Sequence, residues 1–268
     1  MLTSPANPKI KQIRKLRDRK TRSETGLFYM EGLRIVGEAF EQGIQMEYLV
    51  VAPDLLVSSY GQELANLQQT QGVPVLEVSA DTFNSFALKD GPQGIGAVAR
   101  QRWASLPKTR PAHGQLWIAL DSVADPGNLG TILRTSDAVG AQGVILLDQC
   151  TDPYDPSAAR ASMGALFSQK LIKTSFAEFS AWKKQVALPL LGTSGGSDQD
   201  YHTFVYPDPC IVLMGSERQG LLPQHLALCD AVLRIPMTGR SDSLNLAVAT
   251  AVVLYEIYNH RRDKEKRL

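Results

Sequence analysis

Hydrophobic and polar positions give the first half of the chain an alternating pattern. Short apolar runs are separated by stretches whose apolar residues recur at helical spacing. The expected strands are 27–32, 46–52, 73–79 and 95–101, and the expected helices are 8–22, 32–43, 59–72 and 80–90. Alternation of strands and helices at this length predicts a small α/β domain.

The second half has a different pattern, with five apolar runs that are rich in branched residues and alternate little. The runs are 116–121, 143–148, 188–194, 210–215 and 231–236. Helical spacing is found at 129–139, 157–167, 176–186 and 223–229, and a long helix from Leu244 to about His260 ends the pattern. Runs without alternation are typical of strands buried on both faces, so this half predicts a parallel sheet covered by helices.

A stretch of mixed character separates the two halves. Residues 102–114, RWASLPKTRPAHG, hold two prolines, several charges and no periodicity, as is typical of a linker. We therefore expect one domain over 1–101, a linker over 102–114 and a second domain over 115–268.

The net charge of +1 hides a basic segment. Between Lys9 and Arg22 the only acidic residue is Asp18, and the last residues, HRRDKEKRL, are also basic. Such a local excess favours a polyanion as partner over a membrane. The alternative is a solvated helix face or, for the C-terminal residues, a frayed tail.

Three cysteines, Cys150, Cys210 and Cys229, lack the spacing of a disulfide framework or a metal site. No apolar core follows the N-terminal basic residues, and no apolar run reaches the length of a membrane span. We therefore expect a cytoplasmic protein without a membrane or metal partner.

Ligands of open parallel sheets bind beyond the carboxyl ends of the strands. Three unusual segments follow the first, fourth and fifth runs: DPGNLGTILRT, GSERQGL and IPMTGRSDSLNLA. Neither a dinucleotide-binding glycine pattern nor a P-loop is present, because Leu221 stands where a P-loop requires lysine. A nucleotide-dependent oxidoreductase or an NTPase is therefore disfavoured.

Taken together, segments 125–141, 211–221 and 235–256 resemble the three motifs of the SpoU (TrmH-like) branch of the SPOUT RNA methyltransferases. Segments 7–22, 27–39 and 91–99 resemble the L30e-like substrate-binding domain that precedes many such catalytic domains. The resemblance covers nearly the whole chain. It implies S-adenosyl-L-methionine as cofactor and a ribose 2′-hydroxyl of structured RNA, most often ribosomal RNA, as methyl acceptor. It also implies a C-terminal trefoil knot, and a homodimer formed through the knot region and the C-terminal helix.

Site residues are carried over from the motifs of the family. The expected catalytic residues are Asn128, Arg134, Glu217, Ser243 and Asn245. The expected cofactor-binding residues are Thr193, Gly215, Ile235, Met237 and Leu244. One departure is visible: Arg218 follows Glu217 where the family usually has glycine, so a positive φ at this position would strain the backbone.

Several of these residues have simpler interpretations as well. Guanidinium stays protonated in proteins, so Arg134 is better suited to electrostatic stabilisation than to general base catalysis; it could instead pair with Asp137 on a helix surface. Asn128 could cap a helix or occupy a turn, and Asp242 or Ser243 could cap the last helix, with Asn245 in its first turn.

Two other functions stay open beside ribosomal RNA methylation. One is the methylation of transfer RNA, and the other is a non-catalytic RNA-binding or ribosome-assembly protein on the same fold. The intact set of Asn128, Arg134, Glu217 and Asn245 favours an enzyme.

Overall fold

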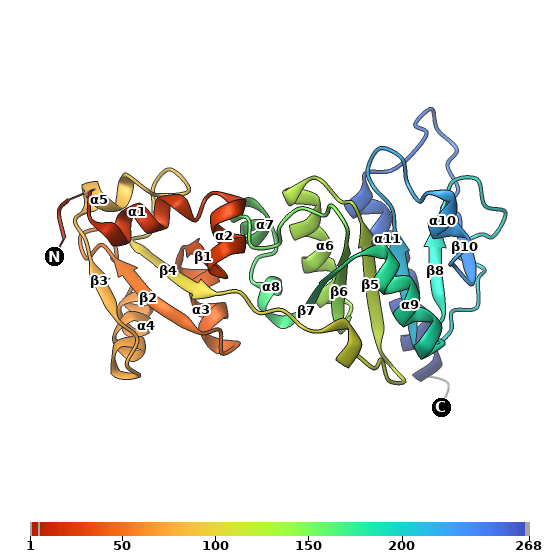
Figure 1. The fold of residues 1–268 in the computed structure, drawn as a ribbon, viewed down its shortest axis with the longest axis horizontal. Coiled ribbons are helices and arrows are strands. Elements are labelled where there is room, and N and C mark those ends of the chain that lie inside the picture. The colour runs from red at the N-terminus through yellow and green to blue at the C-terminus, as the bar shows by residue number, and fades with distance from the viewer. Residues whose placement is uncertain (1, 5, 266–268) are drawn as a thin grey trace. The chain divides into compact units, whose positions relative to one another are not determined.

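The computed structural model describes residues 2–4 and 6–265, which form two compact units (Figure 1). The first consists of Met1–Arg102 together with Asp152–Phe167, and the second of Trp103–Thr151 together with Ser168–Leu268. The first unit therefore includes a segment that comes from the second half of the sequence.

The first unit is built on a four-stranded sheet in the order β1-β4-β2-β3. Strand β4 is antiparallel to both of its neighbours, and β2 is parallel to β3. Its strands are β1 (Leu27–Glu31), β2 (Met46–Val51), β3 (Val75–Glu77) and β4 (Ile95–Arg100). Its helices are α1 (Pro8–Lys15), α2 (Arg19–Thr25), α3 (Leu33–Glu41), α4 (Ser59–Thr70), α5 (Ala80–Asn84), α7 (Pro156–Ala161) and α8 (Ala165–Ser168), whose last residue falls in the second unit. This is the α/β layer architecture that the pattern predicted.

The basic segment forms two helices rather than the single predicted helix over 8–22. Helix α1 ends after Lys15, and Asp18 starts α2 because its carboxylate accepts a hydrogen bond from the Lys20 backbone N–H, the usual role of aspartate at an N-cap. The apolar side chains of Ile10, Ile13 and Leu16 are almost fully buried. The basic segment is therefore part of the core of this unit.

Arg22 shows that some of the basic side chains are structural. It is only 1% exposed. Its Nε lies 2.6 Å from Asp152 Oδ2, its Nη2 lies 3.2 Å from Asp155 Oδ2, and its Nη1 donates to the carbonyls of Leu16 and Arg17. Arg22 therefore does not contribute to the polyanion-binding surface that the basic segment predicts, because its donors are already used inside the protein.

The second unit is built on a six-stranded parallel sheet in the order β10-β8-β9-β5-β6-β7. Its strands are β5 (Leu116–Asp121), β6 (Gly143–Leu147), β7 (Lys170–Thr174), β8 (Leu190–Thr193), β9 (Cys210–Met214) and β10 (Ala231–Leu233). Its helices are the 3₁₀ turn η1 (Leu106–Lys108), α6 (Pro126–Ala138), α9 (Phe176–Val186), α10 (Pro223–Leu226) and α11 (Leu246–Glu265). Because every pair is parallel, the carboxyl ends of β5, β9, β8 and β10 meet at one edge.

The fold differs from the prediction at two places in this region. Strand β7 was not predicted, and the helix expected over 157–167 is broken into α7 and α8. The break contains Met163 at φ 54° and Gly164 at φ 98°. A side chain at position 164 would meet Glu38 at 2.7 Å, so the close approach favours glycine there.

Residues 103–114 of the expected linker belong to the second unit, and two of them hydrogen-bond to other parts of it. The Ala104 N–H donates to the Leu171 carbonyl, and Trp182 Nε1 donates to the Thr109 carbonyl. Trp182 in turn belongs to a buried cluster with Trp117 and Phe179. Along the described residues, no helix combines the length and the apolar character needed to cross a bilayer.

Candidate active site

The first motif connects β5 to α6. Helix α6 begins with Pro126, and the Asp125 carboxylate accepts a hydrogen bond from the Asn128 N–H at 2.7 Å. Proline at the first helical position after an aspartate cap is a strong helix start. Asn128 is therefore not the cap that one reading proposed; it lies in the first turn of α6, with its side-chain amide available for other contacts.

The second motif forms a tight turn after β9. Ser216 and Gly220 pair as an isolated antiparallel bridge, and Gly220 takes a positive φ of 64°. A side chain at Gly215 would meet the Gly220 backbone at 2.1 Å, so only glycine fits there. Arg218 is absent from the described non-glycine residues with positive φ. The family's usual glycine is therefore not required for backbone conformation at this position.

The third motif leads into α11, and its cap is Asn245. The Asn245 side-chain oxygen accepts hydrogen bonds from the N–H groups of Ala247 at 2.9 Å and Val248 at 3.3 Å. The prediction that Asp242 or Ser243 caps this helix is therefore wrong, because α11 begins at Leu246, two residues later than expected.

A hydrogen-bonded network joins the three motifs. Glu217 Oε2 accepts from the Ala124 N–H at 3.1 Å, and Oε1 accepts from the Asp125 N–H and from Asn128 Nδ2, each at 3.2 Å. The Asn128 side-chain oxygen in turn accepts from Asn245 Nδ2 at 3.0 Å. Glu217, Asn128 and Asn245 thus connect the ends of β9 and β5 to the start of α11.

Hydrogen bonding keeps Glu217 ionised. Partial burial raises the pKa of its carboxyl, but the hydrogen bonds from Ala124, Asn128 and Asp125 outweigh this effect and leave the pKa below its ordinary value. A carboxylate that accepts several N–H groups is a rigid anchor for the loops that supply them.

A cavity of about 330 Å³ lies beside this network, within the range of about 300–1,000 Å³ that is typical of small-molecule sites. Its lining includes all the residues expected to bind cofactor and, among the expected catalytic residues, Glu217 and Ser243. Asn128, Arg134 and Asn245 do not line it. Asn128 and Asn245 are linked to it through Glu217.

Arg134 lies further along α6, with an exposed side chain. No hydrogen bond or ion pair of its guanidinium is found among the described residues. The expected alternative, a surface pair with Asp137, is not formed; Asp137 accepts a hydrogen bond from the Ser168 hydroxyl instead. Arg134 is thus free to contact a ligand.

Sequence reasoning missed some residues of the cavity wall. Ser194, Asp242 and Leu246 line the cavity as well. The signal that could have found them is their position at the sheet edge where ligands bind: Ser194 directly follows β8, Asp242 lies in the segment that leads into α11, and Leu246 is the first residue of α11. In the described part of the chain, no group of three or more His, Cys, Asp or Glu residues is arranged to hold a metal ion.

Comparison with known proteins gives two family matches. Residues 115–255 match the SpoU rRNA Methylase family, and residues 7–97 match the MRM3-like substrate binding domain. Similar proteins include the 23S rRNA (uridine(2479)-2′-O)-methyltransferase of Streptomyces viridochromogenes, 30% identical over 92% of this chain and 87% of the relative. The 23S rRNA (guanosine(2553)-2′-O)-methyltransferase RlmP of Bacillus subtilis is 28% identical over 96% of this chain and 98% of the relative.

A solved structure matches over almost the whole length. The AdoMet-bound rRNA methyltransferase from Sinorhizobium meliloti superposes with a TM-score of 0.89 at 37% identity, covering 97% of each chain. The chain belongs to the SpoU family of rRNA methylases.

Proposed function

We propose that this protein is an S-adenosyl-L-methionine-dependent methyltransferase that methylates a ribose 2′-hydroxyl of ribosomal RNA. The observation that carries the proposal is the network of Glu217, Asn128 and Asn245, which joins the three motif loops beside a cavity of cofactor size. The similar proteins named above methylate 23S rRNA, which favours ribosomal RNA over transfer RNA.

The cavity suits the cofactor. Gly215 allows close approach of backbone to backbone at the cavity wall, and Ile235, Met237 and Leu244 supply apolar surface for an adenine. Thr193 and Ser243 add hydroxyl groups. When bound, S-adenosylmethionine supplies a methyl group on a cationic sulfur. The residues of the cavity need only hold that group in line with the acceptor oxygen.

Arg134 is the residue we assign to the acceptor side. It has no competing partner in the described chain, and its permanent charge can hold an RNA phosphate or stabilise the oxygen as it loses its proton. We assign Ser243, which lines the cavity, to orienting the ribose, and we infer that Asn128, Asn245 and Glu217 act by holding the motif loops through their hydrogen bonds.

We propose further that the first unit binds RNA, and that the protein acts in the cytoplasm as a homodimer with a knotted catalytic domain. Support for the dimer comes from α11, where Val248 is 49% exposed and Tyr255 is 45% exposed. Exposed apolar side chains along a helix that also packs on α6 are suited to a second copy of the chain.

Labelled methyl transfer tests the proposal. The full-length protein is incubated with S-adenosylmethionine carrying a labelled methyl group and with ribosomal RNA lacking its natural modifications; transfer RNA and protein-free buffer serve as controls. We expect label in ribosomal RNA, on the ribose after digestion to nucleosides. Label confined to transfer RNA would correct the substrate, and no label in any RNA would reject enzymatic function.

A further inference from the structure

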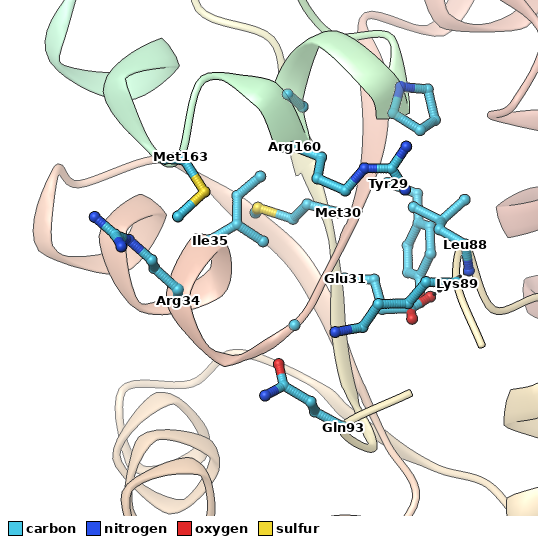
Figure 2. Close-up of a pocket in the computed structure, with 13 residues that line it drawn as sticks. Tyr29, Met30, Glu31, Arg34, Ile35, Leu88, Lys89, Gln93, Arg160 and Met163 are labelled. Atoms are coloured by element: carbon cyan, nitrogen blue, oxygen red, sulfur yellow. Dashed lines mark hydrogen bonds between the residues drawn. The ribbon is translucent and has the colours of Figure 1, made fainter. Parts of the chain in front are cut away.

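A second cavity lies within the first unit, and none of its lining residues belongs to the three motifs (Figure 2). Its volume is about 180 Å³, too small for a typical drug-sized ligand but suited to a single planar ring system. Its walls come from β1, the start of α3, residues 88–93 and the α7 segment. All of these elements belong to the same compact unit.

The polar feature of this cavity is Glu31, at the end of β1. Its Oε2 accepts a hydrogen bond from the Leu88 N–H at 2.8 Å and a longer one from the Tyr29 hydroxyl at 3.4 Å. Its Oε1 is buried and has no hydrogen-bond partner among the described residues. Burial raises the pKa of this carboxyl. A buried acceptor without a donor is rare in proteins, and a ligand carrying N–H groups would supply the missing donor once a small rotation of the Glu31 side chain turned Oε1 toward the cavity.

Three cations surround the same cavity: Arg34, Lys89 and Arg160. All three side chains are exposed, and none forms an ion pair with a described residue. Arginine and lysine in this state attract phosphate groups. Arg160 also lines a neighbouring pocket together with Arg17 and Asp155, and the Asp155 carboxylate there is paired with Arg22.

The apolar part of the cavity is formed by Met30, Ile35 and Met163, which lie together in Figure 2. Met163 is exposed in the left-handed turn between α7 and α8, which brings its side chain to the cavity. Methionine is a flexible and polarisable contact for aromatic rings. An N–H acceptor, an apolar wall and surrounding cations together match the three parts of a nucleotide.

We infer that this cavity receives an unpaired base of the RNA substrate, with Glu31 accepting its N–H groups and Arg34, Lys89 and Arg160 contacting the adjacent phosphates. Protein recognition of RNA sequence commonly uses such unstacked bases. Guanine fits the unpartnered Oε1 best, because its two adjacent N–H donors can both donate to that oxygen, whereas the single N–H of uracil lies between two carbonyl oxygens that would repel Glu31. The inference rests on RNA being the substrate, as proposed above.

Binding of short oligonucleotides tests this inference. The probes are fluorescent uridine oligoribonucleotides, either unsubstituted or carrying a single central guanosine, measured by anisotropy with the full-length protein and no cofactor. We expect the guanosine probe to bind about tenfold more tightly, and Glu31→Gln to remove this preference. Lys89→Ala and Arg160→Ala should weaken both probes equally and reduce the salt dependence. Lys184→Ala, an exposed cation on α9, is the control and should change nothing.

Equal binding of the two probes by the wild-type protein, or an unchanged preference in Glu31→Gln, would overturn the inference. Should Glu31→Gln fail to fold, methyl NMR signals of Met30 and Met163 in the wild-type protein give an independent readout. These signals should shift with the guanosine oligonucleotide at far lower concentration than with free guanosine monophosphate. Shifts at equal concentrations would instead assign the cavity to a free nucleotide, and no shift with either would reject it.

The binding assay does not depend on methyl transfer. A protein that prefers the guanosine probe but transfers no methyl group would refute the proposed enzyme and leave the cavity assigned. A protein that methylates ribosomal RNA but shows no guanosine preference would support the proposed enzyme and refute the role of the cavity.

Discussion

Arg134 is the residue that we propose for the acceptor side of the reaction. Its guanidinium is exposed on α6, and it forms no ion pair with Asp137, which accepts a hydrogen bond from the Ser168 hydroxyl instead. We predict that Arg134→Ala lowers the rate of methyl transfer by about 10²–10³, the usual loss for a preorganised charged donor. Affinity for S-adenosylmethionine and the thermal midpoint should stay unchanged, because Arg134 lines neither the cavity nor the core.

Labelled methyl transfer, cofactor titration and thermal unfolding measure these three quantities. Lys184→Ala on α9 removes an equally exposed cation and should retain full activity. Parental activity in Arg134→Ala would remove Arg134 from the mechanism.

Glu217 gives the network a defined pH dependence. Its pKa is lower in the folded protein than its ordinary value of 4.5. The stabilisation it provides is therefore complete above pH 4.5 and is lost as the pH falls through the lower, folded-state pKa. We predict that the difference in Tm between the wild type and Glu217→Gln is constant at neutral pH and shrinks below pH 4.5. A difference that grows on acidification would contradict this assignment.

The expected site residues came from the resemblance to the family's motifs. Three of them, Asn128, Glu217 and Asn245, meet in one network because motif loops at parallel strand ends converge on one edge. Caps were harder. Asp242, Ser243 and Asn245 are all good helix caps, and only the observed start of α11 selects Asn245. The same holds for Asn128, which Asp125 displaces from the cap position.

At the scale of elements, the basic helices α1 and α2 have a structural role. Arg22 is buried between Asp152 and Asp155, and its removal would leave two carboxylates without their partner. We predict that Arg22→Ala destabilises the first unit by about 3–5 kcal/mol, as is usual for a broken buried pair. Chemical denaturation measures this loss. Lys11→Ala, on the exposed side of α1, should change stability by less than about 0.5 kcal/mol.

A loss below about 1 kcal/mol in Arg22→Ala would show that the pair is not structural.

The burial of Ile10, Ile13 and Leu16 has a consequence for experiments on the basic segment. Deleting residues 1–24 would remove part of the core, so the RNA affinity of the segment must be tested by point substitutions of its exposed lysines.

Element positions follow from sequence where periodicity is long and clear. Helix α9 has the predicted bounds, Phe176–Val186. Strand β7 was not predicted, because the two lysines of KLIKT make this segment more polar than the other strands of the sheet. Such polarity is typical of an edge strand, and β7 lies at one edge of the sheet. The break between α7 and α8 was not predicted, because its left-handed turn begins at Met163, and methionine is not a residue that favours turns.

At the scale of the whole molecule, the order of segments along the sequence does not show which of them pack in the same unit. Segment 152–167 joins the first unit through Arg22, which lies 130 positions from Asp152 in the sequence. Tyr154 also packs on Phe28, with ring centroids 4.7 Å apart. Such long-range pairing depends on tertiary structure and leaves no local pattern, so the predicted boundaries at 101 and 115 could not include it.

The proposed dimer makes a prediction at the same scale. Val248→Glu combined with Tyr255→Glu should convert a dimer into a monomer, because two charges would be placed in an apolar interface. Sedimentation velocity measures the change. Val205→Glu is the matched control, because Val205 is 78% exposed and lies outside α11. A wild type that sediments as a monomer, or a double variant that stays dimeric, would refute the use of this face.

The central claim is that three loops at one sheet edge hold a methyl donor beside a ribose hydroxyl, with Arg134 assisting its loss of a proton. Mapping of 2′-O-methyl groups in the total RNA of cells with the protein, without it, and with Arg134→Ala in its place tests this claim most directly. The account predicts a site in ribosomal RNA that is methylated only when the unaltered protein is present. Identical 2′-O-methylation in all three cells, or a loss confined to base methylation, would contradict it.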